Sequence, residues 1–395
     1  MPDSRLLVVV QRYGDVAGGA ETHARMLVNR LRPHLEVEVA TTTARDYWTW
    51  ENTFPPGETR VDGVPVHRFP VLRRRPRTFR WHENRAFRGG HALADERAFI
   101  EAQGPYVPDL LEFVHEQGRR YDAVLFFTYI YYPTVYGVPI VPERAVLVPT
   151  AHDESALRLT SYRALFHAPR AIAYNSDEER ALVQRVFGNR RVPNDVLGVG
   201  VEVPADISAE RFRQRHGLEG PLLLYVGRIV ESKGAGELFA FFARWRDADP
   251  GSRRATLVLI GEAEMAIPRR EDIRHLGRVS DADKFDAYAA CDLFVIPSRL
   301  ESLSIVALEA WASGKPVLCH AACEVLRGMA RRSGGGLYYA SYAEFSEIAD
   351  RLLADRALAQ SLGAAGRDFV ARTYSWPRIV DTYLDIFAEV RARNS

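Results

Sequence analysis

The stretch DLFVIPSRLESLSIVALEAWASGKPVL, residues 292–318, predicts a strand, a short loop, a helix and a second strand. Its two apolar runs, Leu293–Ile296 and Pro316–Leu318, are short and continuous, which is typical of parallel strands buried on both faces. The helix between them is predicted to begin near Ser302–Ser304. Because strand, helix and strand in this order form a right-handed βαβ unit, the stretch predicts an α/β fold.

The same alternation extends in both directions along the chain. Helices with one apolar face are predicted at Glu21–Leu31 and at Asp283–Ala290. Further buried strands are predicted at Leu6–Val10, Val37–Ala40, Ala123–Phe127, Ala145–Val148, Leu222–Val226 and Thr256–Ile260. The pattern is that of doubly wound, Rossmann-like sheets.

The length of 395 residues favours two domains, since a single core rarely serves so long a chain. The strand pattern starts afresh at Pro221, after a stretch rich in glycine, proline and charge. We therefore expect a first domain over residues 1–205 and a second over 206–375. Residues 376–395 are expected to form a helix that crosses back to the first domain.

The composition is that of a globular protein, with 47% hydrophobic residues and a formal net charge of +1. This balance argues against a nucleic-acid partner. The sequence has neither a signal-peptide pattern nor an apolar run long enough for a membrane span. Three sparse cysteines indicate reduced thiols, so we expect a soluble, cytoplasmic protein. Peripheral contact with the inner membrane face is left open.

Two cations follow the strand Leu222–Val226 at the edge of a sheet where ligands usually bind. Arg228 and Lys233 lie just beyond the strand, where a planar guanidinium and a mobile ammonium suit a diphosphate. The competing interpretation is a pair of solvated loop cations.

Two glutamates eight positions apart, Glu301 and Glu309, follow the next strand. The gap spans about 12 Å in a helix, comparable to the distance from sugar to ribose in a nucleotide sugar. Each carboxylate can accept hydrogen bonds from a pair of hydroxyls, and the backbone N–H groups of Ser302, Leu303 and Ser304 favour a phosphate. The alternative is a capping serine with two ordinary helix glutamates.

The first domain offers two candidate sites at strand ends. Gly18 and Gly19 form a turn at which the backbone can approach a ligand closely. The alternative is a tight turn that needs two glycines for its conformation. His152 follows the strand Ala145–Val148 and is expected to face the same crevice between the domains as Arg228 and Glu301. A satisfied surface histidine is the alternative.

Several patterns carry less weight. The two D-x-D sequences at residues 247–249 and 281–283 are interpreted as helix ends, and no spacing predicts a metal site. Residues 70–106 are irregular and basic, resembling an inserted loop or a helical excursion. The arginines at 73–80 are open to three interpretations, namely a solvated loop, a lipid phosphate site and an anionic glycan site. The aromatic run at 126–136 is either core packing or an acceptor lining.

As a set, these motifs resemble the family 4 glycosyltransferases of the GT-B fold, over almost the whole chain. The resemblance includes GGAE (18–21), GVGVEV (198–203), GRIVESKG (227–234), the paired glutamates and YSWPRIVDTYLDIF (374–387). One departure is Glu301-Ser302-Leu303-Ser304, where that family often has Glu-Gly-Phe-Gly. This departure bears on the identity of the donor sugar.

The resemblance implies a role for each candidate residue. Arg228 and Lys233 would bind the diphosphate, and Glu309 the ribose. Glu301 and His152 would contact the donor sugar near the reacting carbon. The remaining donor-binding residues implied by the resemblance are Gly18, Gly19, Arg278, Val279, Ser302, Leu303, Ser304 and Ile305.

The implied reaction moves a hexose-type sugar from a UDP- or GDP-sugar to a hydroxyl, with retained configuration and without a metal or other cofactor. The acceptor is a glycan, a lipid-linked molecule or a small molecule. The alternatives are a sugar-nucleotide epimerase, a phosphorylase and a non-catalytic binding protein. A dehydrogenase is disfavoured because G-x-G-x-x-G is absent from the sequence.

Overall fold

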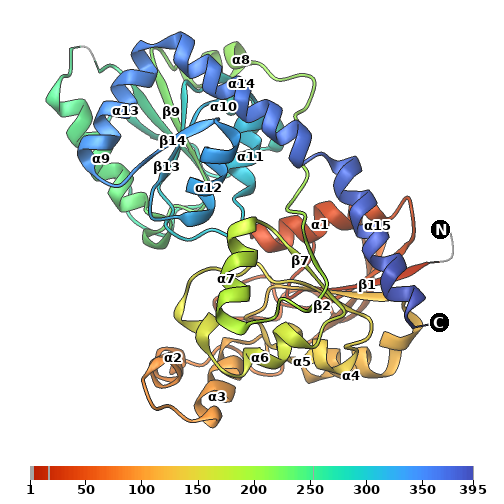
Figure 1. Cartoon of the computed structure of the whole chain (residues 1–395). Helices are drawn as coiled ribbons and strands as arrows, with labels where there is room; N and C mark the ends of the chain where they lie inside the picture. The colour runs from red at the N-terminus through yellow and green to blue at the C-terminus, as the bar shows by residue number, and fades with distance from the viewer. Residues whose placement is uncertain (1–3, 17, 252, 395) are drawn as a thin grey trace. The chain divides into compact units, whose positions relative to one another are not determined.

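The computed structural model describes residues 4–16, 18–251 and 253–394. The chain divides into two compact units. The first unit runs to Val199 and is completed by the segment from Pro377 onward, and the second unit spans Gly200–Trp376 (Figure 1). Both units alternate strands with helices around a mainly parallel sheet, which confirms the predicted α/β class.

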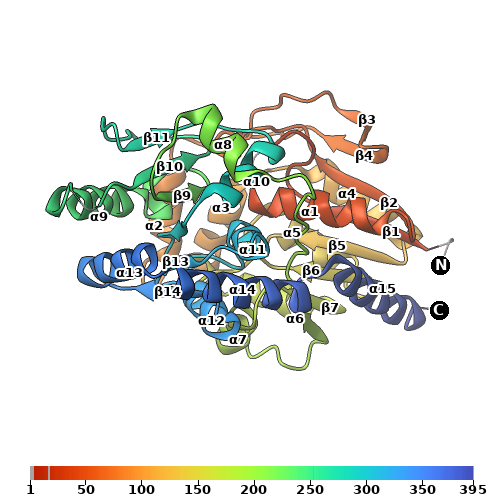
Figure 2. The same cartoon turned by 90° about the horizontal axis from the view of Figure 1, so that it is seen from above.

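The sheet of the first unit has the order β3-β4-β2-β1-β5-β6-β7-β8 and is parallel except for the hairpin β3–β4. Figure 2 shows this order from β3 at one edge towards β7. The strands are β1 (Arg5–Val9), β2 (Glu36–Thr42), β3 (Gly57–Val61), β4 (Val64–Phe69), β5 (Ala123–Phe127), β6 (Ala145–Val148), β7 (Ala171–Tyr174) and β8 (Asn194–Val196).

Helices cover both faces of this sheet, since its central strands are buried on both sides. In β5 and β6 every residue is buried. Helix α1 lies on one face, and α4, α5 and α6 lie on the other (Figure 1). The helices are α1 (Gly19–Leu31), α2 (Phe79–Phe87), α3 (Leu93–Gln103), α4 (Pro108–Gln117), α5 (Tyr132–Gly137), α6 (Tyr162–His167) and α7 (Asp177–Phe187), with short 3-10 turns η1 (Gly118–Arg120), η2 (Val138–Ile140) and η3 (Ser155–Arg158).

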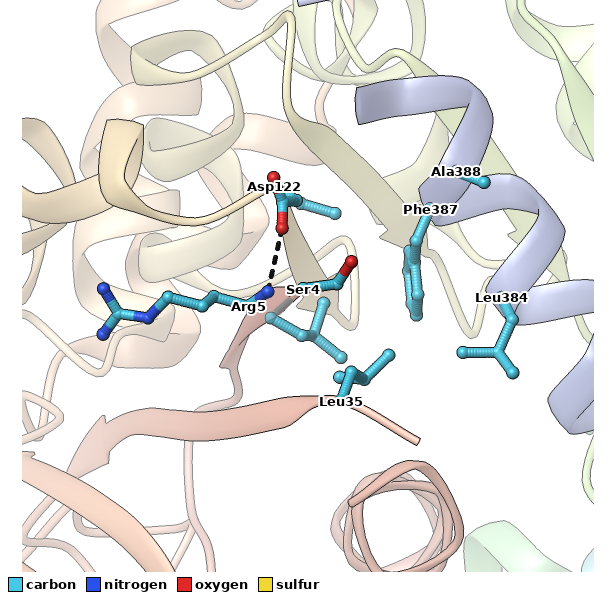
Figure 3. A pocket seen from close by; sticks show the side chains of 9 residues that line it. Ser4, Arg5, Leu35, Asp122, Leu384, Phe387 and Ala388 are labelled. Atoms are coloured by element: carbon cyan, nitrogen blue, oxygen red, sulfur yellow. Dashed lines mark hydrogen bonds between the residues drawn. The ribbon is translucent and has the colours of Figure 1, made fainter. Parts of the chain in front are cut away.

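The last helix, α15 (Trp376–Ala392), packs onto the first unit beside the start of β1. Figure 3 shows Leu384 and Phe387 of this helix facing Leu35, around a cavity of about 20 Å³. Because the cavity lies at the amino ends of β1 and β5, it is opposite the strand ends where α/β sheets bind ligands. We interpret it as a packing gap. No helix of the described residues combines the length and hydropathy needed to cross a membrane.

The sheet of the second unit has the order β11-β10-β9-β12-β13-β14, and every pair of neighbouring strands is parallel. Its strands are β9 (Leu222–Val226), β10 (Thr256–Ile260), β11 (Ile273–His275), β12 (Leu293–Ile296), β13 (Val317–His320) and β14 (Gly336–Tyr339).

Two groups of helices sandwich this second sheet. Helices α9 and α13 share one core cluster with β9, β10 and β12, while α11 packs against α14 (Figure 1). The elements are α8 (Ala209–His216), η4 (Glu231–Lys233), α9 (Ala235–Ala248), α10 (Asp281–Ala290), α11 (Ile305–Ala312), α12 (Glu324–Ser333), α13 (Tyr342–Ala354) and α14 (Arg356–Thr373).

Two element boundaries differ from the sequence-based expectations. Helix α11 begins at Ile305, directly after the predicted start near Ser302–Ser304, because Ser304 has a φ of 75°, which a right-handed helix cannot contain. Strand β13 begins at Val317, because Pro316 has no N–H to donate to a ladder. Of the two forms predicted for the basic stretch 70–106, the structure has the helical excursion, which contains α2 and α3.

Candidate functional site

A lysine and a glutamate predicted to bind the donor lie in direct contact in the second unit. The Lys233 Nζ donates to Glu301 Oε1 at 2.7 Å. Lys233 ends η4, directly after β9, and Glu301 lies in the loop after β12. Because β9 and β12 are neighbours in the sheet, their carboxyl ends bring these two loops together. Both side chains are only partly exposed.

Arg228 occupies the same edge of the sheet. Its Nη1 lies 3.3 Å from Glu264 Oε1, in the loop after β10. The hydroxyl of Tyr225 donates to the Arg228 carbonyl at 2.6 Å and fixes the backbone at the end of β9. Three loops, after β9, β10 and β12, therefore carry charged groups at one edge.

Glu309 lies inside α11 and is 6% exposed. Its two carboxylate oxygens accept hydrogen bonds from Lys284 Nζ at 2.8 Å and from the Tyr288 hydroxyl at 2.9 Å. Burial by itself would lower the pKa of Lys284, but the Glu309 carboxylate raises it above the ordinary value. Each oxygen retains a second lone pair, so the carboxylate can still accept a hydroxyl.

Lys284 and Tyr288 are candidate site residues that no sequence motif indicated. They are four residues apart on α10, so they lie on one face of that helix. This spacing was the available signal, but only the fold shows that the face meets Glu309.

The loop between Glu301 and α11 ends in a strained residue. Ser304 takes a left-handed φ of 75° and is 8% exposed. Its Oγ is buried and has no hydrogen-bond partner. Leu303 packs into the core, whereas Ser302 is half-buried. The first backbone bonds of the helix run from Ala307 and Leu308 to the Ser304 carbonyl, so the N–H of Ile305 precedes the helical ladder.

Arg278 and Val279, two of the donor-binding residues implied by the resemblance, lie in the loop before α10. Arg278 is exposed and Val279 is half-buried. Ser280 then caps α10 by accepting from the Asp283 N–H. The loop therefore leads directly into the helix whose Lys284 contacts Glu309.

The D-x-D sequences lie at a helix end and a helix start, as predicted. Asp247 pairs with Arg270, and Asp281 pairs with Lys284. Within the described parts of the chain, no three histidine, cysteine or carboxylate side chains gather in a group that would hold a metal ion.

In the first unit, the two glycines after β1 differ in their surroundings. A Cβ on Gly18 would lie 2.0 Å from Glu21 Oε2, whereas a Cβ on Gly19 would meet nothing within 4 Å. Glu21 is itself buried and fixed by Arg12 Nη2 at 2.7 Å and by Gln11 Nε2 at 2.9 Å. The fold thus requires glycine at position 18, while open space faces position 19.

His152 lies just beyond β6 with about a third of its side chain exposed. Its Nδ1 is 3.4 Å from Glu154 Oε1, and that oxygen also accepts from the Tyr129 hydroxyl at 2.8 Å. Burial would raise the pKa of Glu154, but the bonds from His152 and Tyr129 lower it. Asp153 pairs with Arg158 instead.

Comparison with known proteins shows similarity to glycosyl transferases. Residues 206–369 match the family model described as glycosyl transferases group 1. The D-inositol 3-phosphate glycosyltransferase of Thermomonospora curvata is 29% identical over 293 residues, which cover 64% of this chain and 66% of that relative. Mannosylfructose-phosphate synthase of Agrobacterium fabrum is 31% identical over 128 residues, or 29% of this chain and 28% of that relative. The chain thus spans less than two thirds of the length of these curated relatives.

Solved structures match at the level of the fold. Sucrose-phosphate synthase from Thermosynechococcus elongatus has a TM-score of 0.71 at 18% identity, covering 99% of this chain and 100% of that chain. The Anabaena protein HepE in complex with UDP and glucose has a TM-score of 0.70 at 16% identity, covering 97% of this chain and 99% of that chain. These neighbours are GT-B glycosyltransferases, which confirms the predicted fold. The narrower assignment to family 4 stays a prediction. Residues 206–369 are therefore similar to a group 1 glycosyl transferase domain, in a chain that has the GT-B fold.

Proposed function

We propose that this chain moves a hexose-type sugar from a UDP- or GDP-sugar to an acceptor hydroxyl, with retained configuration and without a metal. The observation that carries the proposal is the contact between Lys233 and Glu301 beside Arg228, at the carboxyl ends of neighbouring strands. The match of residues 206–369 to a glycosyl transferase family model supports the same activity. The Anabaena neighbour holds UDP and glucose, which supports a nucleotide-sugar donor here.

The Lys233–Glu301 ion pair explains how the donor would be received. In the absence of donor, each charge neutralises the other at 2.7 Å. When the donor binds, Lys233 and Arg228 turn to the diphosphate, and Glu301 is released to accept from the sugar hydroxyls. The two cations then stabilise the negative charge that grows on the leaving nucleotide diphosphate.

The other residues have supporting roles in this proposal. Glu309, held by Lys284 and Tyr288, accepts from the ribose hydroxyls. The open space at Gly19 admits the donor phosphates, and His152 contacts the sugar near the reacting carbon. The N–H groups of Ser302–Ile305 and the loop of Arg278 and Val279 complete the donor site.

The test is a screen of UDP- and GDP-hexoses for release of the nucleotide diphosphate, with and without candidate acceptors. We expect the Lys233→Ala and Glu301→Ala variants to lose activity by at least 100-fold, or about 2.7 kcal/mol of transition-state stabilisation. Glu324→Gln is the matched control, because Glu324 is exposed on the second unit. Near-normal turnover in either alanine variant would sink the site assignment. Loss of activity with a chelator would contradict the metal-free mechanism.

We place the reaction in the cytosol and propose a lipid-linked hydroxyl as the acceptor class. The three cysteines are free, buried thiols, which supports a reducing compartment. Residues 72–97 contain eight arginines and only three acidic residues. On the same excursion, Leu72, Trp81 and Leu93 are more than half exposed. Exposed tryptophan beside basic residues is typical of surfaces that dock on anionic lipids.

Arg77 and Arg80 are exposed and form no ion pair within the part of the chain that the structure describes. They are therefore available to lipid phosphates. We expect sedimentation with phosphatidylglycerol vesicles but not with phosphatidylcholine vesicles, and less binding at high salt. Trp81→Ser should weaken the binding, whereas Tyr338→Ser, an exposed aromatic of the second unit, should not. No binding to the anionic vesicles would refute this docking surface.

A further inference from the structure

A buried glutamate joins two strand ends beneath His152. Glu179 lies in the first turn of α7 and is 1% exposed. One carboxylate oxygen accepts from the Ala151 N–H at 2.5 Å, and the other accepts from the Asn175 N–H at 2.6 Å. Ala151 follows β6 and immediately precedes His152, while Asn175 follows β7. A single carboxylate therefore ties the loop that carries His152 to the neighbouring strand.

The turn that Glu179 holds is strained. Thr150, directly before Ala151, has a φ of 50°, in the left-handed region that β-branched residues avoid. Strain of this kind persists only where the surrounding structure enforces it. The bond from Ala151 to Glu179 is the next backbone interaction after the strained residue, so it is well placed to keep the turn in this conformation.

In the part of the chain that the structure describes, the Glu179 carboxylate has no lysine or arginine partner, and the nearby charge that favours its ionised form is that of His152. Arg180 pairs with Asp177 instead. The titratable groups that face it are His152 beyond β6, Tyr174 on β7 and Tyr383 on α15. Burial raises the pKa of Glu179 to about 7, against the opposing effect of the two backbone N–H bonds. A buried carboxylate without a lysine or arginine partner is costly to keep ionised, and here the two backbone N–H groups offset part of that cost.

We propose that ionised Glu179 is a positioning residue that holds the His152 backbone in place for sugar transfer. The proposal rests on the proposed function, in which His152 contacts the donor sugar. Two acceptor oxygens serve two N–H donors only while the group is ionised. Protonation converts one oxygen into an O–H, which leaves either the Ala151 or the Asn175 amide with a poor acceptor. The turn at Thr150 is then free to relax, and His152 moves with it.

The first test follows the Ala151 and Asn175 amide protons of the wild-type protein by NMR between pH 5.5 and 8.5. We expect both signals to titrate together with a midpoint near pH 7, because both amides bond to the same carboxylate. This measurement needs neither a variant nor enzymatic activity. Amide signals that do not change across this range would overturn the proposal, even if the enzyme transfers sugar.

The second test compares turnover of the wild type with that of Glu179→Gln. We expect a kcat at least tenfold lower in the variant, with KM for the donor within twofold and with the pH dependence near 7 abolished. Glu178→Gln, the same change one residue earlier on α7, should retain wild-type kcat. An unchanged kcat and pH profile in Glu179→Gln would refute the positioning role. If the wild type released no nucleotide from any donor, the proposed function would be wrong. The NMR titration would still show whether Glu179 holds the Ala151 and Asn175 amides.

Discussion

Replacing Ser304 with glycine should stabilise the second unit. The residue has a left-handed φ of 75°, which costs a non-glycine residue about 1–2 kcal/mol. Its buried Oγ has no partner, and an unsatisfied buried hydroxyl costs about 1–3 kcal/mol. The greater freedom of glycine in the unfolded chain opposes these gains by about 0.5–1 kcal/mol. We therefore expect a net gain of about 1–4 kcal/mol in the free energy of unfolding.

The assay is urea unfolding of the wild type and of Ser304→Gly under identical conditions, supported by calorimetry. Ser302→Gly is the matched control, because Ser302 lies in the same loop and is not among the residues with positive φ. The control should lose stability, by about 0.5–1 kcal/mol from the added freedom of glycine in the unfolded chain alone. An equal or lower free energy of unfolding for Ser304→Gly would refute the argument from strain.

The same substitution tests whether the Ser304 hydroxyl serves the donor. If the unpartnered Oγ bonds to the donor, its removal should raise Kd about fivefold to tenfold, equivalent to about 1 kcal/mol. A variant that is more stable but binds the donor more weakly would show that the serine is kept for binding. An unchanged Kd would show that the Ser304 hydroxyl does not bind the donor, which leaves only the backbone N–H of this residue as a donor contact.

Three further predictions concern stability and pH. Gly18→Ala should lower the free energy of unfolding by about 1–3 kcal/mol because its Cβ meets the Glu21 carboxylate. Gly19→Ala should have the melting temperature of the wild type but a lower turnover. Equal melting temperatures of the Gly18→Ala and Gly19→Ala variants would contradict this difference. For Glu179, the folded pKa of about 7 exceeds the ordinary 4.5, so the folded chain retains a proton between pH 4.5 and 7 that the unfolded chain releases. Wild-type stability should therefore fall relative to Glu179→Gln by about 3 kcal/mol as pH rises through that window. Urea unfolding of both proteins at pH 5 and 8 measures this change. The same difference in stability between the two proteins at both pH values would contradict the prediction. Phe387→Ala should lower the free energy of unfolding by about 3–5 kcal/mol, because this buried ring of α15 packs beside the small cavity. A decrease of less than about 1 kcal/mol in urea unfolding would show that α15 is loosely held.

The central strands could be predicted from the sequence because burial on both faces gives each one a continuous apolar run. The predicted bounds of Ala123–Phe127 and Thr256–Ile260 are those of β5 and β10. Strands at the sheet edges gave no such signal. The hairpin strand β3 is mostly exposed and polar, and β11 has a single buried residue, Ile273. Their pairing depends on neighbours that are distant in the sequence.

The candidate site was predictable only in part. The positions of Lys233 and Glu301 at strand ends follow from the α/β pattern, and the fold brings these two side chains together. The contact of Lys284 with Glu309 depends on how α10 and α11 pack, which no local pattern determines. Glu179 reads in the sequence as an ordinary acid in the first turn of a helix, because its bond to Ala151 spans 28 residues.

The most direct measurement of the central claim is calorimetric binding of a nucleotide sugar and of its nucleotide diphosphate, with UDP-glucose against UDP and GDP-mannose against GDP. We predict that the wild type binds one of these pairs. Glu301→Gln should weaken binding of the nucleotide sugar at least tenfold, because Glu301 accepts from the sugar hydroxyls. Its affinity for the diphosphate alone should not fall, because Arg228 and Lys233 remain and Lys233 no longer faces the Glu301 charge. Equal losses for both ligands, or no binding of either pair by the wild type, would contradict the account.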